Sequence, residues 1–151
     1  MLIQKEYPSS LIVRTSAFFG PWDQYNFVHY VRKALSNYET IRVAKDLFIS
    51  ATYVPHLVNT CLDILIDGET GIWHLANKGS LSWADFAFLV ADKFELNKSL
   101  ISGVNADEIN YPAKRPFNSV LSSERAQLLP SFAAAMDEYI NEQKIQKRKV
   151  A

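Results

Sequence analysis

Residues 54–66 place their apolar side chains three or four positions apart, which is the spacing of one face of a helix. The stripe consists of Val54, Leu57, Val58, Cys61, Leu62, Leu65 and Ile66. Pro55 is acceptable in a first helical turn, and Gly68 stands just beyond the last apolar position. The pattern therefore predicts a helix over residues 54–66.

Two further segments have the same helical spacing and recognisable start signals. Residues 26–35 follow Asp23, which is a suitable helix cap. In residues 82–94, Ser82 can cap the helix and Asp85 lies favourably in its first turn. We also expect helices over residues 122–129 and 131–143, broken at Pro130.

Short apolar runs alternate with these helices and predict strands. The expected strands cover residues 11–19, 41–49 with a polar bend, 71–76 and, more weakly marked, 101–104. Strand and helix alternation indicates an α/β fold with parallel pairing. Only two of the strands are strongly marked, which is too few for a complete doubly wound sheet, so we expect an incomplete parallel sheet.

Composition narrows the class of protein. Sixteen basic and sixteen acidic residues cancel, which disfavours nucleic acid and anionic membranes as partners. A basic cluster follows the last apolar repeat, and we interpret residues 144–151 as a disordered tail and residues 1–143 as the folded unit. A single cysteine, no long apolar run and no signal-like start favour a cytoplasmic protein.

Self-contained catalytic sites are poorly supported by the residues. The three histidines lie on different predicted elements, so we expect no metal site. Cys61 belongs to the apolar helix stripe and is interpreted as a core residue. None of the five glycines forms a dinucleotide-binding turn or a nucleophile elbow.

Three segments, in this order and at this spacing, resemble the C-terminal, substrate-binding half of the dTDP-4-dehydrorhamnose reductase and sugar-nucleotide epimerase family of extended short-chain dehydrogenases. They are LIVRTSAFFGPW at residues 11–22, ATYVPHLV at residues 51–58 and AKRPFNSVL at residues 113–121. Shorter matches in type and place occur at residues 26–27, 71–75 and 82–87. The resemblance implies the C-terminal part of a Rossmann-like fold, with a small α/β substrate lobe.

The resemblance also implies what this chain lacks. Members of the family use NADP(H), an N-terminal glycine-rich turn and a Tyr-x-x-x-Lys pair, and neither motif is present here. Residues 1–6 resemble the tail of the helix that carries this pair. We therefore expect a fragment that is inactive alone and binds no NADP(H) alone, with a nucleotide-diphosphate sugar and the missing N-terminal half as partners.

Site residues follow from the same resemblance. Arg115 is the first choice for a substrate diphosphate contact, because guanidinium binds phosphate through two parallel hydrogen bonds. Asn26, Tyr53 and Asn118 are further substrate candidates, although each is equally compatible with a capping, turn or packing role. Ser16, Ala17 and Phe18 are expected beside the nicotinamide of a supplied cofactor half.

Two departures from the family pattern concern the substrate. Ala17 stands where the reductases usually carry tryptophan, and His56 replaces the usual aspartate. The motifs therefore leave reductase and epimerase chemistry both open, and a histidine at position 56 is interpreted as a cap or core contact.

Two hypotheses remain. In the first, the chain is the substrate lobe of an NADP-dependent nucleotide-sugar enzyme; in the second, it is a non-catalytic nucleotide-sugar-binding or oligomerisation module. Both predict an unpaired strand edge near residues 11–18 with uncovered apolar faces, and hence a homo-oligomer.

Overall fold

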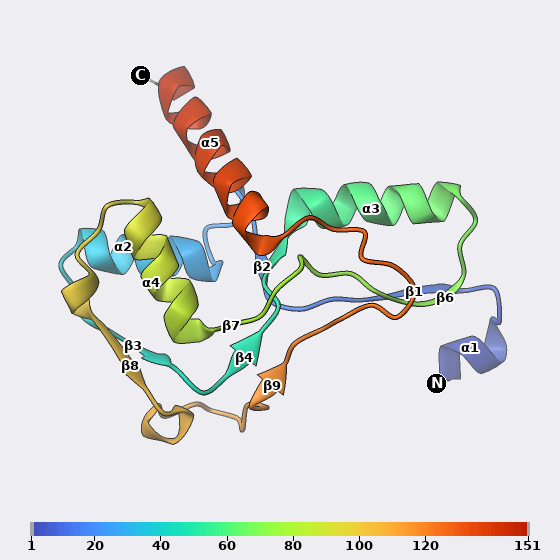
Figure 1. Cartoon of the computed structure of the whole chain (residues 1–151), viewed down its shortest axis with the longest axis horizontal. Coiled ribbons are helices and arrows are strands. Elements are labelled where there is room, and N and C mark those ends of the chain that lie inside the picture. Colours follow the sequence, from blue (N-terminus) through green and yellow to red (C-terminus); the bar gives the residue numbers. More distant parts are fainter. Residues whose placement is uncertain (1, 151) are drawn as a thin grey trace.

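The computed structural model describes residues 2–150, with side chains through residue 145 (Figure 1). Its helices are α1 (Leu2–Glu6), α2 (Phe27–Ser36), α3 (Val54–Ile66), α4 (Trp83–Lys93) and α5 (Phe132–Val150), with 3-10 turns η1 (Lys98–Leu100) and η2 (Ala106–Glu108). Its strands are β1 (Leu11–Arg14), β2 (Phe18–Phe19), β3 (Ile41–Ala44), β4 (Phe48–Ile49), β5 (Thr52–Tyr53), β6 (Gly71–His74), β7 (Leu81–Ser82), β8 (Ile101–Val104) and β9 (Asn118–Ser119). The α/β class is confirmed.

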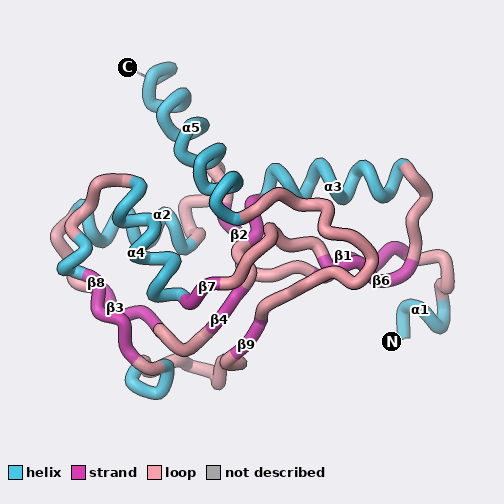
Figure 2. The backbone as a smooth tube through the Cα atoms, in the orientation of Figure 1, coloured by secondary structure: helices cyan, strands magenta, loops and turns pink. Residues whose placement is uncertain are grey.

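The strands are short and form four small groups joined by long loops (Figure 2). Parallel pairs are β1 with β6, β2 with β5 and β3 with β8, while β4 lies between antiparallel β7 and parallel β9. In the described residues β1 pairs only with β6. The expectation of an incomplete parallel sheet with an unpaired strand edge is therefore confirmed.

Helix α3 lies along the β1–β6 pair and forms a small core with it (Figure 1). Ile64 and Trp73 are buried in this core, and Cys61 packs against it as expected. The remaining stripe of α3 faces outward, because Val58, Leu62 and Leu65 are 48%, 51% and 61% exposed. The helix is thus predicted correctly, but most of its apolar face has no partner among the described residues.

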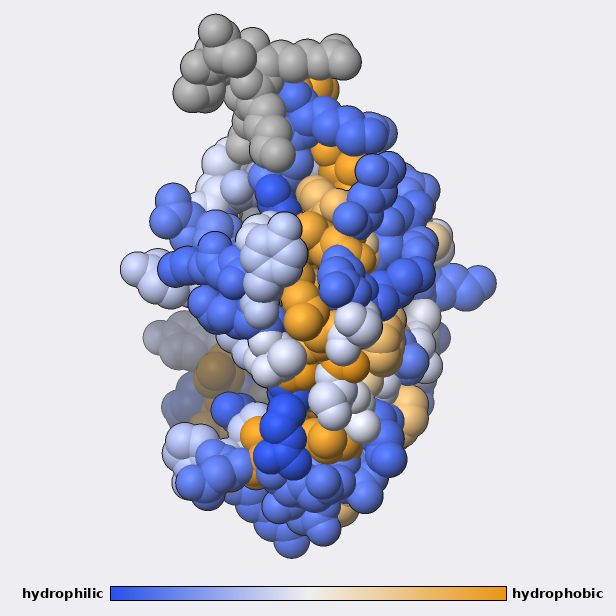
Figure 3. Space-filling view, turned by 90° about the vertical axis from the view of Figure 1, so that its left-hand side faces the viewer, coloured by the Kyte–Doolittle hydropathy of each residue, from blue (hydrophilic) through white to orange (hydrophobic). Residues whose placement is uncertain are grey.

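The larger core lies where α2, α4 and α5 meet. Phe19 is fully buried at its centre, with its ring 5.9 Å from that of Phe86 and 5.8 Å from that of Tyr139. These edge-to-face arrangements are favourable for aromatic pairs. On the face that carries α2 and α4, apolar residues form a narrow vertical band between hydrophilic ones (Figure 3).

Local capping explains where α2 and α4 begin. Ser82 accepts a hydrogen bond from the Asp85 backbone N–H, and the Asp85 carboxylate accepts one from the Ser82 backbone, which completes a capping box. The cap predicted for α2 is wrong: Asn26, not Asp23, accepts the bond from His29 N. Asp23 instead accepts from Tyr25 N inside the preceding turn, because it lies one turn too early in the chain.

The C-terminal region departs most from the sequence prediction. No helix forms over residues 122–129, which run as an irregular segment against β6. Arg125 donates to the Thr70 carbonyl, Gln127 donates to the Ala76 carbonyl, and Leu129 is buried beside α3. Contacts to distant segments thus outweigh the local helical pattern.

Helix α5 continues past Gln143, where its end was predicted, and runs to Val150. The disordered tail predicted for residues 144–151 falls partly outside the described residues and stays a prediction. Within residues 2–150, no helix has the combination of length and hydropathy that crossing a membrane requires.

Candidate functional site

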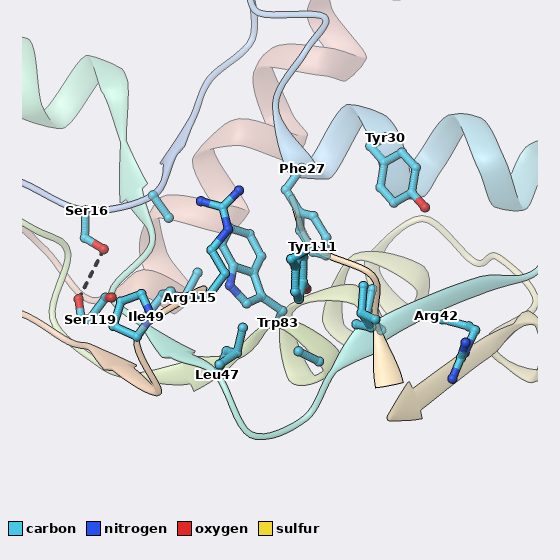
Figure 4. A pocket seen from close by; sticks show the side chains of 15 residues that line it. Ser16, Phe27, Tyr30, Arg42, Leu47, Ile49, Trp83, Tyr111, Arg115 and Ser119 are labelled. Atoms are coloured by element: carbon cyan, nitrogen blue, oxygen red, sulfur yellow. Dashed lines mark hydrogen bonds between the residues drawn. The ribbon is translucent and has the colours of Figure 1, made fainter. Parts of the chain in front are cut away.

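A cavity of about 720 Å³ opens between α2, α4, the β3–β4 connection and residues 109–119, which form an irregular stretch that ends in β9 (Figure 4). Aromatic rings from the first turns of two helices form part of its wall, with Phe27 and Trp83 in edge-to-face contact at 4.7 Å between ring centroids. The remaining lining residues are Ser16, Ala17, Tyr30, Arg42, Val43, Ala44, Leu47, Ile49, Ile109, Tyr111, Arg115, Pro116 and Ser119.

The charged side chains that line this cavity are all positive. Its described lining contains two guanidinium groups, Arg42 and Arg115, and no carboxylate. Within residues 2–145 Arg115 forms no ion pair, and its guanidinium carbon lies 5.7 Å from the centre of the Tyr111 ring. An exposed, unpaired guanidinium beside aromatic walls suits an anionic ligand that also carries a ring.

Arg42, the second guanidinium of the cavity, has a carboxylate partner, Glu108, which lies outside the lining. Arg42 Nη2 donates to Glu108 Oε2 at 3.4 Å.

Burial raises the pKa of the Tyr111 hydroxyl above its ordinary value, against the opposing effect of the Arg115 charge. Tyr111 therefore stays a neutral hydroxyl near neutral pH and adds no negative charge.

Ser16 and Ala17 lie at the rim of the cavity, just after the carboxyl end of β1. Ser16 Oγ donates to the Ser119 carbonyl at 3.3 Å, and Ala17 O accepts from Thr52 N at 2.8 Å. In open α/β sheets ligands bind outside the carboxyl ends of the strands, and these two residues lie at such an end.

The structure brings three predicted site residues to one cavity: Ser16, Ala17 and Arg115. Phe18 does not line it and is 52% exposed on β2. Asn118 lies on β9, where its side-chain oxygen accepts from Val120 N.

Asn26 and Tyr53 are placed away from the cavity. The Asn26 amide donates to the carbonyls of Gly20 and Asp23 while its oxygen caps α2, and the residue is 4% exposed. Tyr53 is fully buried between Phe19 and His56, and burial raises its pKa above the ordinary tyrosine value. The substrate roles of Asn26, Tyr53 and Asn118 stay predictions, and the geometry gives Asn26 and Tyr53 capping and packing roles.

Sequence reasoning missed several lining residues. Arg42 and Tyr30 lie on exposed faces of a strand and a helix, where a charged or aromatic residue carries no local signal. Tyr111 belongs to an irregular stretch with no periodicity. A positional signal did exist for Phe27, Trp83 and Ser119, which stand inside the family-like motifs.

A second hollow of about 460 Å³ lies at the carboxyl ends of β1 and β6. Arg14 and His74 stand side by side there, and His74 Nδ1 lies 3.1 Å from the Ser122 carbonyl. Glu124 and Arg125 also line it, so its charge is mixed. The first cavity, whose described lining carries positive charge only, is the better match to an anionic ligand.

Metal and thiol chemistry find no support in the described residues. No three histidine, cysteine, aspartate or glutamate side chains converge there. Burial raises the pKa of the Cys61 thiol, which keeps it protonated and poorly nucleophilic.

The described residues form an α/β unit with parallel strands and a cavity lined by two guanidinium groups, and comparison with known proteins identifies the family. The model of the RmlD substrate binding domain family matches residues 1–145, and the chain belongs to this family. It is 32% identical to the spore coat polysaccharide biosynthesis protein SpsK of Bacillus subtilis, covering 93% of this chain and 50% of that one. It is 34% identical to a dTDP-4-dehydrorhamnose reductase of Aggregatibacter actinomycetemcomitans, covering 80% and 44%.

Solved structures show the same fold. A dTDP-4-dehydrorhamnose reductase from Bacillus anthracis, solved in complex with NADP, superposes with a TM-score of 0.81 at 27% identity, covering 87% of this chain and 48% of that one. An orthologue from Clostridium acetobutylicum gives a TM-score of 0.85 at 24% identity, covering 94% and 51%. The chain spans about half the length of the curated relatives it matches.

Proposed function

We propose that this chain is the nucleotide-sugar-binding part of an NADP-dependent reductase or epimerase similar to dTDP-4-dehydrorhamnose reductase. The observation that carries the proposal is the cavity itself, which combines aromatic walls with two guanidinium groups and, among the described lining residues, no carboxylate. Its volume of about 720 Å³ lies within the range of small-molecule sites, roughly 300–1,000 Å³.

Each part of a nucleotide sugar has a matching surface. Arg115 has no carboxylate partner among the described residues, and the diphosphate would supply the missing negative charge. A guanidinium binds phosphate oxygens through paired hydrogen bonds. The rings of Phe27 and Tyr111 offer faces on which a base or sugar packs. Hydroxyl and carbonyl groups at Ser16 and Ser119 suit the sugar end.

The described residues do not fit a whole dinucleotide. No glycine-rich turn is present to hold its pyrophosphate. The glycines nearest the parallel strands serve other purposes, because Gly71 begins β6 and a side chain at Gly20 would lie against Val54. When bound by the rest of an intact enzyme, NADP(H) would supply the hydride. In the proposal Ser16, Ala17 and Phe18 flank the nicotinamide, and the partner half supplies the remaining contacts.

One observation favours a second candidate, a non-catalytic nucleotide-sugar-binding module. The described lining of the cavity comes from residues 16–119 and already contains both guanidinium groups and the aromatic walls that the proposal assigns to the nucleotide sugar. The two candidates differ in whether a dinucleotide-binding half joins this chain and restores NADPH oxidation.

Calorimetric titration of the purified chain with dTDP-glucose, dTDP and NADPH tests the proposal. We expect dTDP and dTDP-glucose to bind, and Arg115→Ala to weaken both about tenfold or more, because a charge-assisted hydrogen bond contributes roughly 1.5–3 kcal/mol. Lys114→Ala is the matched control, since it removes the same charge one residue away and outside the cavity lining. Equal losses from both variants, or no binding by the unaltered chain, would contradict the proposal.

A further inference from the structure

The two arginines of the cavity occupy different positions along its length. Figure 4 shows Ser16 and Arg42 at opposite ends, with Arg115 and Tyr111 between them. If the diphosphate lies at Arg115 and the sugar points toward Ser16, as the proposed function has it, the nucleoside extends toward Arg42. The following inference rests on that proposed function.

A series of hydrogen bonds orients the guanidinium of Arg42. Glu108 Oε2 accepts from Arg42 Nη2 at 3.4 Å, and Glu108 Oε1 accepts from the Asn105 backbone N–H at 3.0 Å. The 3-10 turn that carries Glu108 is tied to the end of β3, because Ala106 N donates to Asp46 Oδ1 at 2.8 Å. Glu108 is therefore oriented by backbone contacts before it orients the guanidinium.

This ion pair has little to do with folding stability. The side chains of Arg42 and Glu108 are 57% and 48% exposed, and pairs this exposed contribute little. Only one guanidinium nitrogen is engaged in the described contacts, so the other N–H groups are available to a ligand in the cavity.

We infer that Arg42 reads an exocyclic carbonyl oxygen of the nucleobase, with Glu108 as its positioning residue. A guanidinium only donates hydrogen bonds, so it selects ring edges that accept them. Thymine and uracil carry two exocyclic carbonyl oxygens and guanine carries one, whereas adenine accepts only at ring nitrogens and carries an exocyclic amino group that donates. In Figure 4 Tyr30 lies on the Arg42 side of the cavity and Tyr111 lies between Arg42 and Arg115, so their rings offer stacking surfaces along the path to Arg42 that do not distinguish one base from another.

The experiment titrates the full chain with dTDP, UDP, GDP, ADP and inorganic pyrophosphate. We expect dTDP and UDP to bind about tenfold more tightly than ADP, and Arg42→Ala to remove this preference by weakening dTDP and UDP about tenfold more than it weakens ADP and pyrophosphate. Glu108→Gln should reduce the preference in part without affecting pyrophosphate, which a purely structural role would not do. Lys45→Ala, a charge loss next to the same strand and outside the lining, is the control.

The remaining outcomes are decisive. If GDP binding depends on Arg42 as strongly as dTDP binding does, the result supports carbonyl recognition and identifies guanine as a second base that Arg42 recognises. A uniform loss for all ligands including pyrophosphate would assign Arg42 to phosphate and overturn the inference, as would an unchanged base preference. Binding that depends on Arg115 but shows no base preference overturns this inference alone, whereas no binding of any diphosphate overturns the proposed function as well.

Discussion

Asn77 is the side chain whose removal should destabilise this fold most clearly through hydrogen bonding. It is 1% exposed, and its Oδ1 accepts from Tyr53 N at 2.8 Å. Its Nδ2 donates to the Pro130 carbonyl at 3.0 Å and faces His56 Nδ1 at 3.1 Å. One amide thus joins β5, the first turn of α3 and the residues that lead into α5.

The proton positions in this hydrogen-bond network follow from the one group whose role is fixed, the Tyr53 backbone N–H. The Tyr53 backbone N–H can only donate, which assigns the Asn77 oxygen to it and the NH2 group to the other two partners. His56 Nδ1 must then accept, so its proton resides on Nε2 and is donated to Glu138 Oε2 at 2.9 Å. His56 therefore connects α3 to α5, in agreement with its interpretation as a core contact.

Asn77→Ala would leave a buried N–H, a carbonyl and an imidazole nitrogen without their partner. Each unsatisfied buried group costs about 1–3 kcal/mol, and partial hydration recovers some of the total, so we expect a loss of about 3–5 kcal/mol. Asn77→Asp keeps the acceptor for Tyr53 but loses both donors and places a charge beside the Pro130 carbonyl, for which we expect about 2–4 kcal/mol.

Urea unfolding followed by tryptophan fluorescence measures these losses as changes in midpoint at constant slope. In thermal melts each kcal/mol corresponds to about 2–4 °C for a chain of this size. Asn59→Ala on the exposed side of α3 is the control, expected within about 0.5 kcal/mol of the unaltered chain. An Asn77→Ala loss below about 1 kcal/mol, or one matching the control, would refute the network as described.

Two further predictions concern alkaline stability and association. Burial raises the pKa of Tyr53, so stability present below about pH 10 is lost as pH rises, because only the unfolded chain ionises there. Tyr53→Phe should reduce the stability lost between pH 10 and 11 in urea titrations by about 1 kcal/mol, since the unfolded tyrosine goes from half to almost fully ionised over that interval, and an unchanged loss would contradict the prediction. The exposed apolar stripe of Val58, Leu62 and Leu65 predicts a dimer or larger oligomer in sedimentation velocity at micromolar concentration. Leu62→Lys should dissociate this oligomer, and a compact monomer of the unaltered chain would refute the prediction.

Local sequence determined most of the helices. The predicted helix over residues 54–66 has the bounds of α3, because Pro55 suits its first turn and Gly68 adopts a φ of 71° just after its end. The Ser82 and Asp85 capping box likewise marks the start of α4 as expected. These signals involve residues a few positions apart, so they can be recognised without the fold.

Only the tertiary structure decided which residues meet. Residues 122–129 carry a helical pattern but form an irregular segment, because Arg125 and Gln127 donate to the carbonyls of Thr70 and Ala76, which lie just before and just after β6. Arg42 and Arg115 line one cavity although they lie far apart in sequence. The apolar stripe on α3 predicted a helix correctly but not its exposure, because burial depends on which segments pack against a face, and periodicity carries no information about that partner.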